Sequence, residues 1–148
     1  MLKLINLSRE EFPHYQGWLE RGLDLAYDII PEQENMPYNE ALDATIDVAE
    51  GCECIVVHCT ETNRFVLCFY EYGCRSQHLP GYGIVMYLTI GNGTGRMYRK
   101  LLNYLHAFCR STTPAHKWIQ VHHRVGEYTY KMKYHHVRNL NEWCKESF

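Results

Sequence analysis

The sequence predicts an α+β fold, in which helices flank a mixed β-sheet. Three observations support this prediction. Apolar residues recur at helical spacing in several stretches, β-branched and aromatic runs of strand length lie between them, and a glycine-dense turn joins one such run to the longest helix. No repeat or linker-like stretch interrupts the chain, and 148 residues are a usual length for one domain. We therefore expect residues 1–148 to form a single domain.

Composition and charge restrict the class of protein. Hydrophobic residues make up 46% of the chain and aromatic residues 14%, which excludes a disordered protein. A formal net charge of −2 gives no reason to expect nucleic-acid binding, and no apolar run has the length needed to span a bilayer. Seven cysteines without a signal-peptide pattern indicate reduced thiols. We expect a cytoplasmic protein that binds neither membranes nor nucleic acid.

The first half of the chain predicts a strand, two helices and a β-hairpin. Ser8 followed by Glu11 is a capping-box pattern, which favours a helix start before the apolar stripe that includes Trp18 and Leu23. Gly51 follows the second helix as a C-terminal cap. The expected elements are a strand over residues 2–7, a helix ending near residue 28, a loop over 31–37, a helix over 38–50, and a hairpin of strands 52–60 and 65–73.

The second half contains the stretch around which we expect the fold to be organised. A β-branched and aromatic run over 82–90 predicts a buried strand. Met97, Leu101 and Leu105 then recur at helical spacing and form an apolar face. The expected elements are the strand 82–90, a glycine turn, a helix ending near residue 111, a strand over 117–125, a short helix over 127–136 and a tail over 137–148.

Three glycines at alternate positions, Gly91, Gly93 and Gly95, separate this strand from this helix. Glycine permits positive φ and a close approach of the backbone to a ligand. The first turn of a helix adds unbonded N–H groups and the positive end of its dipole, so the turn predicts a phosphate-sized anion site. The alternative is a tight connection that binds nothing. A dinucleotide fingerprint is excluded because the third glycine comes too early, and a P-loop because no Gly-Lys-Ser/Thr follows.

The element order and the motif Gly93-Thr94-Gly95 resemble the GCN5-related N-acetyltransferase (GNAT) superfamily. Members bind the pyrophosphate of acetyl-coenzyme A on the backbone amides of this turn and transfer the acetyl group to an amine. The resemblance implies a mostly antiparallel central sheet, acetyl-coenzyme A as cofactor and an amine as acceptor. The cofactor-binding residues that it implies are Gly91, Gly93, Thr94, Gly95, Arg96 and Met97.

The resemblance also indicates catalytic residues. The stretch 129–134, Thr-Tyr-Lys-Met-Lys-Tyr, is similar to the segment in which a family tyrosine protonates the departing thiolate. Tyr130 falls at that position and is the implied general acid. An amine acceptor must also lose a proton before it attacks, and the candidate bases near the expected cleft are Glu71, which we take as catalytic, and His78. A solvated surface role is the alternative for both.

The chain departs from the family pattern at three points. Ile90 stands where members carry Gln or Arg, Tyr134 replaces a glycine, and little chain follows. In these respects it is more similar to the small, reduced GNAT-like proteins carried inside podovirus particles. The alternative function is therefore that of a catalytically inactive bacteriophage protein, an internal virion component or a host-interaction protein, which works by protein contact in a viral assembly.

A run of cysteine and histidine could suggest a metal site. Cys52, Cys54 and His58 alternate along one expected strand, with Cys59 next to them. Zinc sites usually combine a C-x-x-C turn with a second ligand pair, and free cysteine packs well as a small buried hydrophobe. We therefore favour packing over zinc binding and expect no metal.

Overall fold

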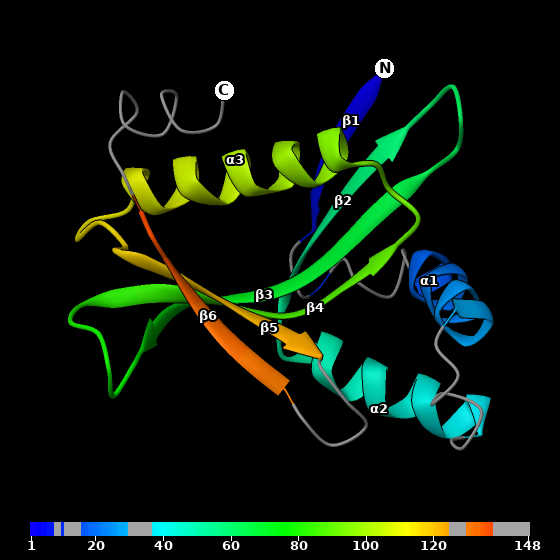
Figure 1. Ribbon diagram of the computed structural model, residues 1–148, viewed down its shortest axis with the longest axis horizontal. Helices are drawn as coiled ribbons and strands as arrows, with labels where there is room; N and C mark the ends of the chain where they lie inside the picture. The colour runs from blue at the N-terminus through cyan, green and yellow to red at the C-terminus, as the bar shows by residue number, and fades with distance from the viewer. Residues whose placement is uncertain (8–9, 11–15, 30–36, 125–129, 138–148) are drawn as a thin grey trace. The chain divides into compact units, whose positions relative to one another are not determined.

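The computed structural model of the protein describes residues 1–7, 10, 16–29, 37–124 and 130–137 (Figure 1). Its elements are β1 (Leu2–Leu7), α1 (Gln16–Ile29), α2 (Tyr38–Glu50), β2 (Glu53–Cys59), β3 (Phe65–Arg75), β4 (Tyr82–Gly91), α3 (Gly95–Ser111), β5 (Trp118–Arg124) and β6 (Tyr130–His136). The strands are hydrogen-bonded in the order β1-β2-β3-β4-β5-β6. β4 and β5 are parallel, whereas β1–β2, β2–β3 and β5–β6 are antiparallel. A mostly antiparallel sheet accompanied by helices confirms the predicted α+β class.

Most observed elements lie within one or two residues of the predicted ones. Helix α2 covers the predicted residues 38–50 and has Gly51 at its C-terminal cap, and α1 ends at Ile29, next to its predicted end. The predicted strand before the glycine turn is β4, in the central sheet. No helix in the described part of the chain is long and apolar enough to cross a membrane. The predicted capping box at residues 8 and 11, residues 31–36 of the predicted loop 31–37 and residues 138–148 of the predicted tail 137–148 lie outside the described residues.

The short helix predicted over residues 127–136 is wrong. Tyr130–His136 form β6, a strand antiparallel to β5. Gln120 of β5 lies opposite Tyr134, and its Nε2 donates a hydrogen bond to the Tyr134 hydroxyl oxygen at 3.2 Å. In this stretch lysines alternate with aromatic or apolar residues, which is the period of a strand. The alternation is visible in the sequence, and the pairing with β5 shows that this segment is a strand.

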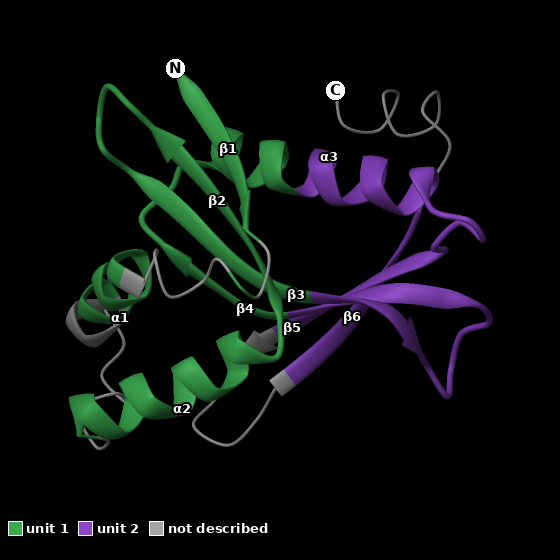
Figure 2. Cartoon of the chain, turned by 180° about the vertical axis from the view of Figure 1, so that it is seen from behind, with its two compact units in different colours: residues 1–70, 87–101 green, residues 71–86, 102–148 purple. Residues whose placement is uncertain are grey.

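The chain forms two compact units, each made of two chain segments (Figure 2). Unit 1 contains residues 1–70 and 87–101, and unit 2 contains residues 71–86 and 102–148. The elements β3, β4 and α3 therefore contribute residues to both units. That residues 1–148 behave as one domain stays a prediction.

Unit 1 has an apolar core to which α1, α2 and the strands β1 to β3 contribute. Burial of each large apolar side chain stabilises the fold by about 1.5–3 kcal/mol. At the edge of this core, the guanidinium of Arg21 lies 4.8 Å from the ring centre of Trp18 and 4.7 Å from that of Phe65. The core holds the end of β2 and the start of β3 in place. The turn that connects these two strands lines the cavity that we take as the candidate functional site. The buried members of the core are Leu7, Leu19, Ala49, Cys52, Cys54, Val56, Phe65, Leu67 and Phe69.

In unit 2, β4 and β5 approach each other closely. A Cβ atom at Gly83 would lie 2.1 Å from Cδ2 of Trp118, so glycine is required at this position. Trp118 is fully buried, and its ring centre lies 5.6 Å from that of Tyr134 in an edge-to-face contact. The indole ring of Trp118 in β5 thus fills the space that a side chain at position 83 of β4 would need.

Candidate functional site at the start of helix α3

The turn between β4 and α3 is tied to the first residue of β3. The amide of Asn92 donates a hydrogen bond to the carbonyl oxygen of Phe65 at 3.1 Å. In return, the amide of Phe65 donates to Oδ1 of Asn92 at 3.1 Å. Phe65 is fully buried in the core of unit 1. These two bonds fix the start of α3 next to the β2–β3 turn.

Two of the three glycines of this turn have a packing role. A Cβ atom at Gly91 would lie 2.3 Å from the carbonyl oxygen of Phe65, and the residue has a φ of 134°. A Cβ atom at Gly93 would lie 2.1 Å from Cγ2 of Val66, whereas at Gly95 nothing lies within 4 Å. Packing against β3 thus accounts for glycine at 91 and 93 without a ligand, and their role in cofactor binding stays a prediction. The space beside Gly95 is open.

The first turn of α3 presents backbone donors. The carbonyl oxygen of Thr94 accepts hydrogen bonds from the amides of Met97 at 3.0 Å and Tyr98 at 3.2 Å, so Thr94 is the residue that precedes the helix. Within the part of the chain that the structure describes, no group accepts a hydrogen bond from the amide of Gly95 or Arg96. These amides carry the partial positive charge of the helix terminus and favour a negatively charged partner.

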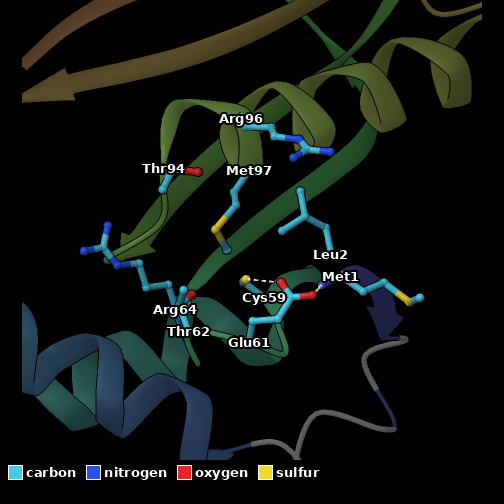
Figure 3. A pocket seen from close by; sticks show the side chains of 9 residues that line it. All are labelled: Met1, Leu2, Cys59, Glu61, Thr62, Arg64, Thr94, Arg96 and Met97. Carbon is cyan, nitrogen blue, oxygen red and sulfur yellow. Dashed lines mark hydrogen bonds and ion pairs between the residues drawn. The ribbon is translucent and has the colours of Figure 1, made fainter.

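A cavity of about 480 Å³ opens beside this helix start (Figure 3). Its wall is formed by the first turn of α3, by the β2–β3 turn and by the first residues of β1. The side chain of Met97 points into the space, and the guanidinium ends of Arg64 and Arg96 lie at two different sides of it (Figure 3). The lining residues, all in unit 1, are Met1, Leu2, Cys59, Glu61, Thr62, Arg64, Thr94, Arg96 and Met97.

The charges around this cavity favour an anion. Two arginines, Arg64 and Arg96, stand against one carboxylate, Glu61. Glu61 is engaged by the N-terminal ammonium of Met1, and the hydrogen bond from this ammonium, followed by that from the Cys59 thiol, holds the pKa of Glu61 below its usual value. Among the described residues, neither arginine forms an ion pair. Both guanidinium groups therefore keep their donors for a ligand.

The thiol of Cys59 is a further polar group of this wall. Cys59 is the last residue of β2 and is partly exposed. Its Sγ donates a hydrogen bond to Oε2 of Glu61 at 3.5 Å. Hydrogen bonds from Thr62, first from its side chain and then from its backbone, lower the pKa of Cys59. A thiolate is therefore easier to form here than at an ordinary cysteine.

The structure brings together one part of the predicted cofactor site and adds residues that the sequence did not indicate. Thr94, Arg96 and Met97, three of the residues implied to bind the cofactor, line the cavity, and their role in cofactor binding stays a prediction. Cys59, Glu61, Thr62 and Arg64 form its other side, in a segment where the sequence predicts a strand end and a polar hairpin turn and indicates no ligand site. The sequence predicted the hairpin to which these residues belong. It did not predict that the hairpin turn lies next to the start of α3, because no local pattern specifies this contact.

The predicted catalytic residues lie in unit 2. Glu71 is a half-buried residue of β3, and His78 is exposed in the loop between β3 and β4. Tyr130 is the first residue of β6, opposite Arg124, and its side chain lies outside the described part. The cavity belongs to unit 1, so the roles of Glu71 and Tyr130 in a shared active site stay predictions.

The cysteines and histidine of β2 and its flank have packing and hydrogen-bonding roles. Cys52 and Cys54 are buried in the core of unit 1. Nε2 of His58 lies 2.8 Å from Oδ1 of Asn63, and its ring packs edge-on against Trp18 with 5.0 Å between ring centres. Among the described residues, no group of three or more His, Cys, Asp or Glu side chains is placed to hold a metal ion.

No family model matches the chain, and neither curated proteins nor solved structures include a significant match to it. The functional interpretation therefore depends on the geometry and chemistry of the cavity.

Proposed function

We propose that the protein binds a phosphate-bearing ligand of the acyl-coenzyme A class in the cavity at the start of α3 and transfers the acyl group to an amine. The observation that carries the binding step is that Arg64 and Arg96 line one cavity beside the start of a helix. Among the described residues, the first two amides of that helix have no hydrogen-bond acceptor. Arginine binds phosphate oxygens through paired N–H groups, and a helix N-terminus adds backbone donors and a favourable dipole.

The size and lining of the cavity suit an organic ligand that carries the phosphate. Small-molecule sites commonly measure about 300–1,000 Å³, and this one measures about 480 Å³. Leu2 contributes apolar surface, while Thr62 and Thr94 contribute hydroxyl groups. A coenzyme with an anionic part and a mixed polar and apolar arm would find partners for each part in this lining.

The residues that fit such a coenzyme lie in the second half of the turn. The open space at Gly95 and the unbonded amides of Gly95 and Arg96 are suited to phosphate oxygens. At Gly91 and Gly93, the Cβ positions face Phe65 and Val66. The coenzyme would supply an activated acyl group as its thioester, and the chain would supply binding and orientation.

The transfer step follows from the resemblance to GNAT proteins. In this proposal Glu71 accepts a proton from the acceptor amine, directly or through water, and Tyr130 donates a proton to the thiolate that departs. The amine nitrogen forms a bond to the acyl carbon as the carbon–sulfur bond breaks. Each of these two roles requires the residue to reach the reacting atoms within hydrogen-bond distance.

Thermal unfolding with three ligands tests the binding step. At about one hundred times its dissociation constant, a ligand raises the free energy of unfolding by about 2.7 kcal/mol. We expect stabilisation by acetyl-coenzyme A and by coenzyme A, but none by pantetheine, which lacks the phosphates. Arg96→Ala should weaken the effect, whereas Arg99→Ala, an exposed site on the same helix outside the cavity lining, should preserve it. No stabilisation by millimolar acetyl-coenzyme A would reject the proposal.

A second candidate function, a viral or host-interaction protein that works by contact, is favoured by exposed aromatic side chains in unit 2. Tyr72 is 50% exposed and Tyr82 39% exposed. Their ring centres lie 6.5 and 6.4 Å from that of the buried His116. Exposed tyrosine side chains that are held in place by buried neighbours are common in protein interfaces. This candidate predicts no stabilisation by any of the three ligands above.

A further inference from the structure

We propose that Cys59 is a thiol–disulfide exchange site, at which an anionic disulfide, such as that of glutathione or of coenzyme A, attaches one of its halves to the protein and blocks the cavity. The proposal rests on the proposed function for the preference of the cavity for anions. The exchange itself depends on the surroundings of the sulfur.

The turn after β2 holds polar groups around this sulfur. The amide of Asn63 donates to the carbonyl oxygen of Cys59 at 2.8 Å, and the amide of Cys59 donates to the carbonyl oxygen of Arg64 at 2.9 Å. This closed turn keeps Thr62, whose hydrogen bonds lower the pKa of Cys59, beside the thiol. The cavity lining contains Cys59, Glu61, Thr62 and Arg64 together, so a molecule in the cavity would lie beside Cys59.

Other described cysteines are poorly suited to exchange. Burial raises the pKa of Cys68 and of Cys109 to about 12, and raises that of Cys54 and Cys74 as well. A buried neutral thiol is a weak nucleophile because only the thiolate attacks a disulfide. In the described part of the chain, Cys59 combines partial exposure with a lowered pKa, so labelling should be selective for it.

The two arginines determine which disulfides are favoured. Glutathione and coenzyme A are anionic near neutral pH, and Arg64 and Arg96 line the same cavity as Cys59. Cystamine, a disulfide with two ammonium groups, has the opposite charge. A comparison of these reagents therefore separates attraction by the cavity from the intrinsic reactivity of the thiol.

The reaction balances without a further oxidant. Cys59 loses its thiol proton to solvent, and the thiolate attacks one sulfur of the disulfide. A bond forms between Sγ and that sulfur while the original sulfur–sulfur bond breaks. Its electron pair leaves on the second sulfur, which takes a proton from solvent. Cys59 is oxidised and the released thiol is reduced.

Mass spectrometry of the intact full-length protein, followed by peptide mapping, tests the proposal. The folded protein is incubated with glutathione disulfide, coenzyme A disulfide or cystamine at equal concentration, and adduct formation is followed in time. We expect one adduct, on the peptide that contains Cys59, and faster labelling by both anionic disulfides than by cystamine. Arg96→Ala should slow the anionic reagents by about threefold or more, and Arg99→Ala should not. High salt should remove the difference.

Two results would overturn the proposal. One is an adduct that maps to another cysteine, including Cys144 outside the described residues, while Cys59 stays free. The other is labelling of Cys59 by cystamine as fast as by the anionic disulfides. The mapping uses the wild-type protein, so it does not depend on whether Cys59→Ser folds. Selective anionic labelling without stabilisation by acetyl-coenzyme A would reject the proposed function and retain the exchange site. Stabilisation by acetyl-coenzyme A without labelling of Cys59 would reject the exchange site and retain the proposed function.

Discussion

Asn92 satisfies both backbone hydrogen-bonding groups of Phe65, one through its own amide and one through its side-chain oxygen. The bond to the side-chain oxygen depends on the identity of residue 92, whereas the bond from its backbone amide does not. It joins the turn before α3 to the buried first residue of β3, and the β2–β3 turn ends immediately before that residue. The cavity is formed by the groups on either side of this link.

Replacement of Asn92 by alanine should therefore destabilise the protein. Asn92→Ala leaves the partly buried amide of Phe65 without its acceptor, which costs about 1–2 kcal/mol. The free energy of unfolding in urea measures this loss. Asn39→Ala, at an exposed position in α2, is the matched control and should change stability by less than about 0.5 kcal/mol. Equal effects of the two substitutions would show that the Asn92–Phe65 link contributes nothing.

The glycines of the turn should respond to alanine in opposite ways. Gly91→Ala places a Cβ against the backbone of Phe65 at a positive φ, so we expect a loss of about 2 kcal/mol or more. Gly95→Ala meets open space at the first residue of α3 and should be neutral or stabilise by up to about 1 kcal/mol. Thermal or urea unfolding of both variants measures the contrast. A Gly95→Ala variant as unstable as Gly91→Ala would contradict the geometry of the turn.

His116 is held in its neutral form in unit 2. The amide of Gly73 donates to its Nε2 at 2.8 Å, so the ring proton is on Nδ1, which lies 2.7 Å from Oγ1 of Thr112. Burial lowers the pKa of His116. The unfolded chain therefore binds a proton at this residue more readily than the folded protein does.

The protein should lose stability in acid through His116. Its contribution is fully present above the unfolded-state pKa of about 6.5 and is lost as pH falls through the lower folded-state pKa. Urea unfolding between about pH 5 and pH 8 measures the loss, and His116→Gln should reduce this pH dependence. His78→Gln, at an exposed histidine of the same unit, should retain it. An unchanged pH dependence in His116→Gln would contradict the assignment.

Local sequence patterns predicted most of the helices and strands because the spacing of apolar residues within each segment indicates its secondary structure. Apolar periodicity indicated α3, and the polar connection after β2 indicated the hairpin. The prediction was wrong at β6. The tyrosines and lysines of this segment are compatible with a helix or with a strand, and the hydrogen-bonded pairing with β5 selects the strand. Of the residues that line the cavity, the sequence singled out Thr94, Arg96 and Met97 as ligand-binding candidates, and that role stays a prediction. The contribution of Arg64 and Cys59 arises from contacts between segments about 30 residues apart, which single-sequence periodicity does not encode.

The catalytic part of the proposal leads to a separate kinetic prediction. Tyr130→Phe should retain the stabilisation by acetyl-coenzyme A but reduce the rate of acyl transfer to an amine by about 100-fold, because a general acid contributes on this scale. Glu71→Gln should act in the same direction. Thiol release from acetyl-coenzyme A in the presence of a panel of amines measures the rate. Transfer at the wild-type rate in both variants would remove these residues from the mechanism.

The central claim, that the start of α3 and the β2–β3 turn bind a phosphate-bearing ligand, is tested most directly by NMR titration of the ¹⁵N-labelled protein with coenzyme A. The account predicts saturable shifts of the Gly95 and Arg96 amide signals and of the Arg64 side chain, with no such shifts on titration with pantetheine. Coenzyme A that leaves these signals unchanged at millimolar concentration, or that shifts only signals of unit 2, would contradict it.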